Sequence, residues 1–521
     1  MADASPAIKA TTEWPGTTRA YHLRSGAIMY STDGITRINA SAAFGDMPWD
    51  RNIFGHFIEH FHTQIYGGIF DLGSPLSDEN GFRMDVIEAL RELRLPIMRW
   101  PGGNYVSDHH WYEAVGPSRI ASYNKAWRVE EPNTFGTDEF IKWCELVGCE
   151  PYICTNGGNG TAEEMSNWVE YCNGHLKTRY AEQRRMNGSP EPFGVKFWGI
   201  GNESYGDWQI GAKTAAEWGP YVAESAKMMR AVDENIVLSA AAVPDAEWTL
   251  SLLKSAGRYL NLVSIHGYWD QIHQVEAPSD YLTAMMQTEK PARMIEETRH
   301  VIGAAGLTGK VRIAFDEWNL RGWHHPNGNS QDKIDARALN DVPTTYTMAD
   351  AIFSAGFLNA CLKNADIVAM ANVAPSVNTR GPLFVHPQGI VRRTTFHAMK
   401  LYAEHIRERI LATVTSAPAL THHGNTVSSV DALVSVDVDG ATVTIINRDP
   451  EREADCAIDI NGRELKGEWQ GELLTAASPD DFNSIERPES VVPRTVTLID
   501  DGGRYRVPPH SIVMLHMSAT R

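Results

Sequence analysis

Residues 195–203, VKFWGIGNE, decide the fold predicted for this chain. The run is rich in apolar, β-branched and aromatic residues until it stops at Asn202 and Glu203, as expected of a buried strand. A second run of the same kind, VRIAFDEWN at residues 311–319, carries Glu317 near its end. Apolar residues on both faces are typical of parallel strands. We therefore expect each glutamate to leave the core and enter a cleft above the sheet.

From these runs outward, residues 45–402 alternate short apolar strands with amphipathic helices. The predicted strands are 52–58, 96–100, 150–154, 195–200, 236–241, 261–266, 311–316 and 366–372. Helical spacing of apolar residues predicts helices between them, for example over residues 81–93 and 137–147. Eight strand–helix units predict an α/β fold, a (β/α)₈ TIM barrel with long loops. An open doubly wound sheet is the alternative, but no GxGxxG motif follows any strand.

The pattern changes over residues 403–521, where short alternating segments such as LVSVDVDG and TVTIINRD are separated by turn residues. This pattern predicts a C-terminal antiparallel β-sandwich (jelly-roll) domain. Residues 26–43 predict a hairpin, and because it has no other partner, residues 21–44 are expected to join the sandwich. Residues 1–20 carry no periodicity and are expected to form a flexible N-terminal arm.

The composition limits the classes of ligand that this protein is expected to bind. A formal charge of −18 over 521 residues argues against nucleic acid and against an anionic membrane surface, whereas a neutral sugar is compatible with it. No run of 18 apolar residues occurs, and the N-terminus lacks the apolar centre of a secretory signal, so a cytoplasmic location is expected. The six cysteines do not have the spacing of a zinc ribbon and are expected to be buried free thiols.

Polar side chains converge at the strand ends, where barrel enzymes place their catalytic groups. They comprise carboxylates, amides, a guanidinium, an imidazole and a phenol: Glu59, Arg99, Asn104, Asn202, Glu203, His266, Tyr268 and Glu317. Such a set suits a ring with many hydroxyl groups. Strands four and seven lie on opposite sides of a barrel, so Glu203 and Glu317 are predicted to face each other. A protonated and an ionised carboxyl group in that arrangement would cleave a glycosidic bond, with Glu203 as acid/base and Glu317 as nucleophile.

Eight of the fifteen tryptophans lie at strand ends or in the loops that follow, among them Trp111 and Trp318. Stacking on sugar rings is preferred over packing alone, because indole combines apolar area with a hydrogen-bond donor. Both tryptophans are therefore predicted to bind substrate.

Histidines form three groups, around His56 and His62, at His109 and His110, and near residue 324. A metal-dependent barrel hydrolase is thus an alternative, but no HExxH motif occurs, and no metal or cofactor is predicted. A sugar-binding protein without catalytic activity is a second alternative.

With these residues in place, the chain resembles the family 51 glycoside hydrolases, known mainly for α-L-arabinofuranosidases. The matching blocks are GHFIEH (55–60), YGGIFD (66–71), RWPGGNYVS (99–107), GIGNES (199–204), DWQIG (207–211) and FDEWN (315–319). The resemblance implies a barrel with a C-terminal β-sandwich, retention of anomeric configuration, no cofactor, and a homo-oligomer, often a hexamer. It also implies that Glu59, Asn104, Asn202 and Tyr268 bind the sugar and that Arg99 and His266 support the glutamates.

The chain departs from the family pattern at several positions: His56 before FIEH, Phe61-His62-Thr63 after it, His109 and His110 in the second loop, and Pro375 in place of the usual glutamine. One hydroxyl-binding group can decide between ring types, so these changes bear on the exact sugar. The predicted activity is exo-acting removal of arabinofuranose from arabinoxylan or arabinan oligosaccharides by double displacement. The alternative on the same site is a β-xylosidase, acting on xylose-containing oligosaccharides, or a β-glucan endo-hydrolase.

Overall fold

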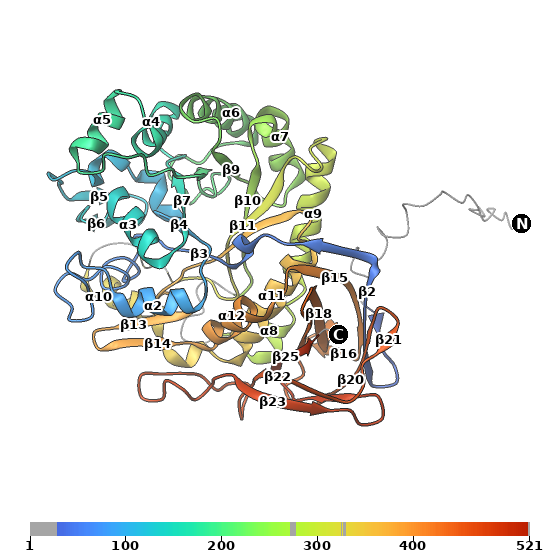
Figure 1. The fold of residues 1–521 in the computed structure, drawn as a ribbon. Helices are drawn as coiled ribbons and strands as arrows, with labels where there is room; N and C mark the ends of the chain where they lie inside the picture. Colours follow the sequence, from blue (N-terminus) through green and yellow to red (C-terminus); the bar gives the residue numbers. More distant parts are fainter. Residues whose placement is uncertain (1–28, 271–277, 325, 327–329, 519–521) are drawn as a thin grey trace, which may run out of the picture.

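The structure, a computed structural model, describes residues 29–270, 278–324, 326 and 330–518, so the predicted arm over residues 1–20 lies outside the described residues. Eight parallel strands close into a barrel in the order β10-β11-β12-β3-β4-β7-β8-β9 (Figure 1). In chain order they are β3 (Gly55–Phe57), β4 (Ile97–Trp100), β7 (Glu150–Thr155), β8 (Phe197–Ile200), β9 (Val237–Ala241), β10 (Leu262–Tyr268), β11 (Arg312–Asn319) and β12 (Val368–Val373). Each overlaps one predicted strand, and the predicted TIM barrel is confirmed.

Helices surround the barrel strands (Figure 1), and most of them contribute buried apolar residues to the main core. They are α2 (Met84–Glu92), α3 (Thr137–Val147), α4 (Ala162–Asn173), α5 (Arg179–Met186), α6 (Ala215–Val232), α7 (Ala246–Ala256), α8 (Tyr281–Met285), α9 (Lys290–Ala304), α10 (Gln331–Arg337), α11 (Met348–Lys363) and α12 (Thr394–His405). Helix α11 is buried along nearly its whole length, because it lies between the barrel and the C-terminal sheet. Such a position explains why its sequence is apolar on all sides.

The C-terminal part of the chain forms an eleven-stranded sheet, ordered β21-β20-β2-β15-β18-β19-β25-β22-β23, with β1 on β15 and β24 on β20. Its strands are β1 (Met29–Tyr30), β2 (Ile35–Pro48), β15 (Arg409–Ala417), β18 (Val430–Asp437), β19 (Gly440–Asn447), β20 (Ala454–Ile460), β21 (Arg463–Glu464), β22 (Glu468–Leu474), β23 (Arg494–Ile499), β24 (Tyr505–Val507) and β25 (Ser511–Ser518). Most pairs are antiparallel, but β2 pairs with β20, and β1 with β15, in parallel. The curved sheet encloses a second core, which includes Ile38, Val443 and Leu515.

The N-terminal strands join this sheet, but the predicted hairpin over residues 26–43 is wrong. Strands β1 and β2 each pair with β15, and β2 also pairs with β20 on its other side. The short connection between them suggested a hairpin, whereas each strand gains a longer partner across the sheet. The division at residues 44/45 and 402/403 stays a prediction; β2 and α12 run across those two limits.

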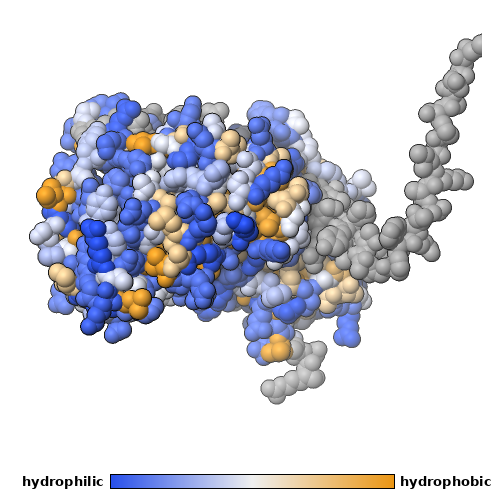
Figure 2. All heavy atoms as spheres, turned by 90° about the horizontal axis from the view of Figure 1, so that it is seen from above, coloured by the Kyte–Doolittle hydropathy of each residue, from blue (hydrophilic) through white to orange (hydrophobic). Residues whose placement is uncertain are grey.

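The face of the molecule shown in Figure 2 is largely hydrophilic. On the face shown in Figure 2, hydrophobic side chains lie in small separate groups among charged and polar ones. All six cysteines are free thiols, as predicted, and all but Cys149 are buried. Within the part of the chain that the structure describes, every helix is too short or too polar to cross a lipid bilayer.

Candidate active site

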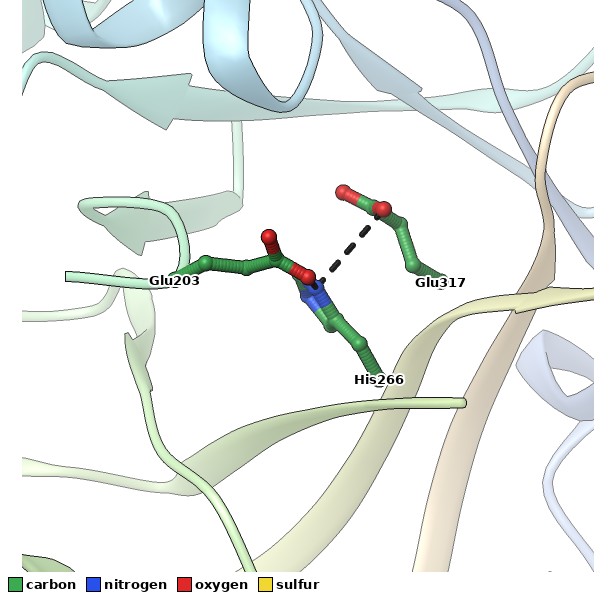
Figure 3. Close-up of side chains that lie close together, drawn as sticks. All are labelled: Glu203, His266 and Glu317. Atoms are coloured by element: carbon green, nitrogen blue, oxygen red, sulfur yellow. Dashed lines mark hydrogen bonds and ion pairs between the residues drawn. The ribbon is translucent and has the colours of Figure 1, made fainter. Parts of the chain in front are cut away.

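Glu203 and Glu317 meet above the C-terminal ends of the barrel strands, with His266 between them (Figure 3). The imidazole Nδ1 lies 2.9 Å from Oε1 of Glu203 and 3.7 Å from Oε2 of Glu317. One oxygen of each carboxyl group lies within 4.8 Å of the other. The two glutamates that the sequence pattern singled out therefore share one site.

The backbone after β8 turns sharply to present Glu203. Gly201 has a φ of 68° and Glu203 has a φ of 41°, both in the left-handed region. Glutamate rarely adopts this conformation, which costs on the order of 1–3 kcal/mol when the surrounding structure enforces it. Such strain at a carboxyl group that faces another one is typical of a functional site.

Irregular pairing near the ends of β10 and β11 brings consecutive residues into the barrel. The register shifts between Ser264 and His266 on one side and between Phe315 and Trp318 on the other. Regular alternation would send Asp316 and Glu317 to opposite faces. The irregularity lets both carboxylates reach the interior, as bulges beside active sites often do. His266 and Glu317 are direct neighbours across the two strands.

Arg99 connects the nucleophile candidate to its neighbours. Its Nη1 donates to Oε1 of Glu317 at 2.7 Å, and its Nη2 donates to Oδ1 of Asn202 at 2.6 Å. Tyr268 donates its hydroxyl to Oε2 of Glu317 at 2.8 Å. Each oxygen of Glu317 thus accepts one hydrogen bond, and the buried guanidinium compensates the charge of an ionised carboxylate.

Asp316 is the buried anion beneath this pair. It accepts hydrogen bonds from Tyr152 at 2.7 Å and Ser264 at 2.5 Å, and it lies 3.5 Å from Nε of Arg99. Burial alone would raise the pKa of Asp316, but the arginine charge and the hydrogen bonds, one of them with His266, lower it to about 2. A permanent negative charge therefore lies next to the imidazole.

His266 is held in the charged form by this surrounding. Burial disfavours the imidazolium, yet the charge of Glu317 and the hydrogen bonds with Asp316 and Glu203 raise the pKa of His266 to about 10. Burial likewise disfavours the carboxylate of Glu203, but the hydrogen bond from His266 and the one from Trp208 lower its pKa. Both shifts favour a protonated imidazole hydrogen-bonded to an ionised Glu203.

Glu59 lies deeper, under a cover of aromatic rings. Its Oε1 accepts hydrogen bonds, each 2.9 Å long, from the backbone N–H groups of Gly103 and Tyr105 and from Nε1 of Trp127. Burial raises the pKa of Glu59 to about 8; these hydrogen bonds oppose that shift, and the charge of Glu317 adds to it. Its second oxygen receives none of the three and is suited to a sugar hydroxyl.

The amide side chains of Asn202 and Asn104 and the backbone of Gly103 form a further part of the site. Asn202 is buried, and its Nδ2 donor has no hydrogen-bond partner among the described residues. An unused buried donor beside two carboxylates is suited to a ligand oxygen. Asn104 accepts a hydrogen bond from Gln209. Gly103 brings the backbone close, because a Cβ atom there would lie 2.9 Å from Oε1 of Glu317.

The structure places the indole rings of Trp111 and Trp318 in packed surroundings, and their roles in substrate binding stay predictions. Trp318 is 1% exposed and stacks on Phe357 of α11 at a centroid distance of 3.9 Å, because it follows Glu317 on the strand and faces the helix layer. Trp111 is also 1% exposed and donates its indole N–H to the backbone of Glu164. It lines a surface depression together with Tyr112, Glu164 and Tyr180.

Two further side chains contribute to the site: Asp316 has no role predicted from the sequence, and Trp208 is predicted only as one of the eight tryptophans at strand ends or in the loops that follow. Asp316 was seen only as the neighbour of Glu317, and nothing in the strand pattern signals the bulge that turns it inward. Trp208 is 59% exposed and donates to Oε2 of Glu203 at 3.0 Å. Its position five residues after Glu203, in a glycine-containing loop, was the available signal.

Two departures from the family pattern contact each other. His56 lies 2.8 Å from the hydroxyl of Ser376, the residue after Pro375, and its pKa falls to about 3 because it is buried. A neutral imidazole and a serine hydroxyl therefore fill this part of the wall together. The peptide bond before Pro375 is cis.

The other departures each have partners of their own. His62 approaches Asp341 at 3.9 Å. His110 pairs with Glu164 at 2.9 Å, and that hydrogen bond raises the pKa of His110. His109 is buried against aromatic rings, and burial lowers its pKa.

A divalent ion at the catalytic cluster would compete with a proton. Glu203, His266 and Glu317 each offer a ligand atom within 4.8 Å of the others. A metal needs neutral imidazole, however, and the pKa of His266 is about 10. The imidazolium and Arg99 already supply positive charge, which favours acid/base chemistry by the carboxyl groups over metal binding.

Comparison with known proteins gives one consistent family. Residues 89–292 match the family described as the α-L-arabinofuranosidase 1 domain, and residues 316–511 match the α-L-arabinofuranosidase C-terminal domain. The probable α-L-arabinofuranosidase C of Aspergillus clavatus is 34% identical over 499 residues, which cover 90% of this chain and 94% of that protein. The intracellular exo-α-(1→5)-L-arabinofuranosidase of Streptomyces lividans is 31% identical, with coverage of 89% and 72%.

A solved structure agrees with the sequence relatives. The crystal structure of α-L-arabinofuranosidase from Thermotoga maritima, an arabinose complex, has a TM-score of 0.82 and 32% sequence identity. The match covers 93% of this chain and 100% of that chain, so both the barrel and the C-terminal sheet are included.

Proposed function

The chain belongs to the α-L-arabinofuranosidase family of retaining glycoside hydrolases, and from that premise we propose that Glu203 is its acid/base and Glu317 its nucleophile. The substrate is an arabinose-containing oligosaccharide, from which the enzyme releases terminal arabinofuranose. Glu59, Asn104, Asn202 and Tyr268 hold the sugar, and Arg99 and His266 position the carboxyl groups.

The first step forms a covalent intermediate. A carboxylate oxygen of Glu317 attacks the anomeric carbon, the bond from that carbon to the leaving-group oxygen breaks, and Glu203 gives its proton to that oxygen. Arg99 and Tyr268 hold Glu317 in a fixed orientation, so little reorganisation is needed at the moment of attack.

The proton for this step comes from the Glu203–His266 pair. The imidazolium Nδ1–H lies 2.9 Å from Oε1 of Glu203, within proton-transfer distance. A sugar in the site removes water and disfavours the two separated charges, which moves the proton onto Glu203. His266 thereby acts as the proton store for the acid.

The second step regenerates the enzyme. Glu203, now ionised, takes a proton from water, and the water oxygen attacks the anomeric carbon while the bond to Glu317 breaks. Two inversions at one carbon give net retention.

The separation of the carboxyl groups carries this assignment. Their nearest oxygens lie within 4.8 Å of each other. Retaining enzymes place the two groups about 5–5.5 Å apart, whereas inverting enzymes need roughly 6.5–9.5 Å to admit a water molecule.

Rescue of activity by azide distinguishes the nucleophile from the acid/base residue. Glu317→Ala should lose turnover of an aryl α-L-arabinofuranoside, and azide should restore it with an inverted glycosyl azide as product. Glu203→Ala should lose far less kcat/KM on activated aryl leaving groups than on oligosaccharides, whose departure needs a proton, and its turnover of both should be limited by the second step, which lacks its base. With that variant, azide should give the retained product. Exchanged outcomes, or equal losses on both substrate types, would contradict the assignment.

A panel of substrates tests which sugar the enzyme releases. Purified enzyme should release arabinofuranose from aryl arabinofuranoside and from arabinoxylan or arabinan oligosaccharides faster than it cleaves aryl xyloside or β-glucan. Faster cleavage of the xyloside would favour the β-xylosidase alternative. That alternative is worth testing because His56 and Pro375 depart from the family pattern in the wall of the site.

Assembly and location form part of the proposal. The family resemblance supports a homo-oligomer, with a hexamer possible, and light scattering should give a mass that is a multiple of 57.9 kDa. The intracellular relative from Streptomyces lividans supports a cytoplasmic location. A monomer in solution, or activity found only outside the cells, would contradict these two points.

A further inference from the structure

A second cluster of histidine and carboxylate side chains lies far from the glutamates. Glu404 and His405 end helix α12, and Glu472 projects from strand β22. Each offers one ligand atom, and these atoms lie within 4.8 Å of one another. Barrel helices run antiparallel to the strands, so the C-terminal end of α12 lies at the opposite end of the barrel from the catalytic site.

The register of the sheet directs these groups to the seam between the barrel and the sheet. Glu472 pairs with Met514 on β25, and Met514 packs into the barrel core. His516 lies two residues further along β25 and so shares the face of Met514. Its ring centroid is 4.4 Å from that of His405. Both sides of the seam therefore contribute ligand-type side chains.

Two ring nitrogens in the cluster lack a hydrogen-bond partner. Nε2 of His405 and Nε2 of His516 are buried and unpaired among the described residues. Nε2 of His405 lies 3.6 Å from Oε2 of Glu472, which is beyond hydrogen-bond distance. Buried polar atoms left unpaired cost stability, so their presence in one cluster needs an explanation.

The spacing suits coordination better than hydrogen bonding. A tetrahedral zinc ion holds nitrogen and oxygen ligands at about 2.0–2.1 Å, which puts neighbouring ligand atoms about 3.4 Å apart. The observed 3.6 Å between His405 and Glu472 is close to that value. Lys400, 3.8 Å from Glu404, is the cation with which a metal ion would compete.

We propose that Glu404, His405 and Glu472 bind a divalent transition-metal ion of the Zn²⁺ class, with His516 beside the remaining coordination position. A mixed imidazole and carboxylate set is typical of zinc, whereas calcium and magnesium take oxygen ligands. The ion joins the end of α12 to the C-terminal sheet. It stabilises the folded chain and takes no part in glycoside hydrolysis.

Calorimetric titration of the full chain, pretreated with chelator, tests the proposal. Zn²⁺ should bind, and the unfolding midpoint should rise, because an ion that binds only the folded state stabilises it. His405→Ala and Glu472→Gln should each weaken binding at this site at least about 10-fold and remove the rise in the midpoint. Ca²⁺ should produce neither effect in the wild-type protein.

His422 supplies the matched control. Its Nε2 is also buried and unpaired, and its ring lies 4.0 Å from that of His423, but it approaches a single carboxylate, Asp280, at 3.4 Å. His422→Ala should bind Zn²⁺ like the wild-type protein. Its arabinofuranosidase activity and that of His405→Ala should be unchanged.

Three results would overturn the proposal. They are absence of Zn²⁺ binding in the wild-type chain, equal binding by His405→Ala, and a loss in His422→Ala as large as in His405→Ala. Glu404→Gln, at a side chain that is 31% exposed, keeps the test valid if the other variants fold poorly, because it removes one ligand without opening a cavity. Unchanged Zn²⁺ affinity in folded Glu404→Gln would remove Glu404 from the site.

Discussion

Glu203 needs a proton that its own surroundings do not favour. Its pKa is lowered, whereas that of His266 is raised to about 10, so the pair keeps one proton on the imidazole over a wide pH range. Two coupled groups titrate as a unit, and the loss of their last proton sets the basic limb of the activity profile. In His266→Gln, Glu203 alone must hold the proton.

We therefore expect His266→Gln to move the basic limb of kcat/KM to lower pH by about 2 units or more, since a lone glutamate titrates far below 10. The loss at high pH should be larger for oligosaccharides than for activated aryl glycosides. A pH profile measured with both substrate types checks this. An unmoved basic limb would mean that the proton is not stored on His266.

The same residue links stability to pH. The pKa of His266 in the folded protein, about 10, exceeds the ordinary value of 6.5, so the folded state binds the extra proton between these values. Its contribution to stability is complete below pH 6.5 and is lost as pH rises through 10. The denaturant midpoint of the wild-type protein should fall more steeply over that range than that of His266→Gln, and parallel curves would contradict this.

At the scale of the element, strand β11 shows what a sequence can and cannot predict. Its apolar run and its end at Glu317 were readable, and so was its place in a barrel. The bulge that turns Asp316 inward was not, because it depends on pairing with β10 and β12. The place of Trp318 was not predictable for a related reason: indole at a strand end can pack in a core as well as on a sugar, and its stacking on Phe357 of α11 depends on the tertiary structure.

Trp318→Ala should lower the stability of the protein, whereas Trp208→Ala should lower its activity. Removing the buried Trp318 ring should cost about 3–5 kcal/mol of unfolding free energy and leave KM near the wild-type value. Removing the exposed Trp208 should change stability by less than about 0.5 kcal/mol, yet lower kcat/KM because Glu203 loses a hydrogen-bond donor. Denaturant unfolding and steady-state kinetics of both variants measure this. A raised KM with unchanged stability in Trp318→Ala would support its predicted role in binding sugar.

At the scale of the whole molecule, strands from the N-terminal and C-terminal parts of the described chain build one sheet, which packs against the barrel helices α11 and α12. The change of pattern after residue 402 and the unpaired strand near the N-terminus were sufficient to predict that association. The exact partners of β1 and β2 were not predictable, because strand pairing over such long sequence separations is decided by the shape of the finished sheet.

Strand β2 lies inside the sheet, between β15 and β20, so the C-terminal residues are an incomplete domain without it. A fragment of residues 409–521 would expose the edges of β15 and β20 and uncover apolar side chains that Ile38 packs against. We expect this fragment to be unfolded or aggregated, and a fusion that places residues 29–48 before it through a flexible linker to fold. Circular dichroism and gel filtration of both proteins test this, with a fusion carrying Ile38→Asp as the control that keeps the length but not the packing. Cooperative unfolding of the 409–521 fragment alone would show that the sheet does not need the N-terminal strand, and the barrel would then be an insertion beside an independent domain.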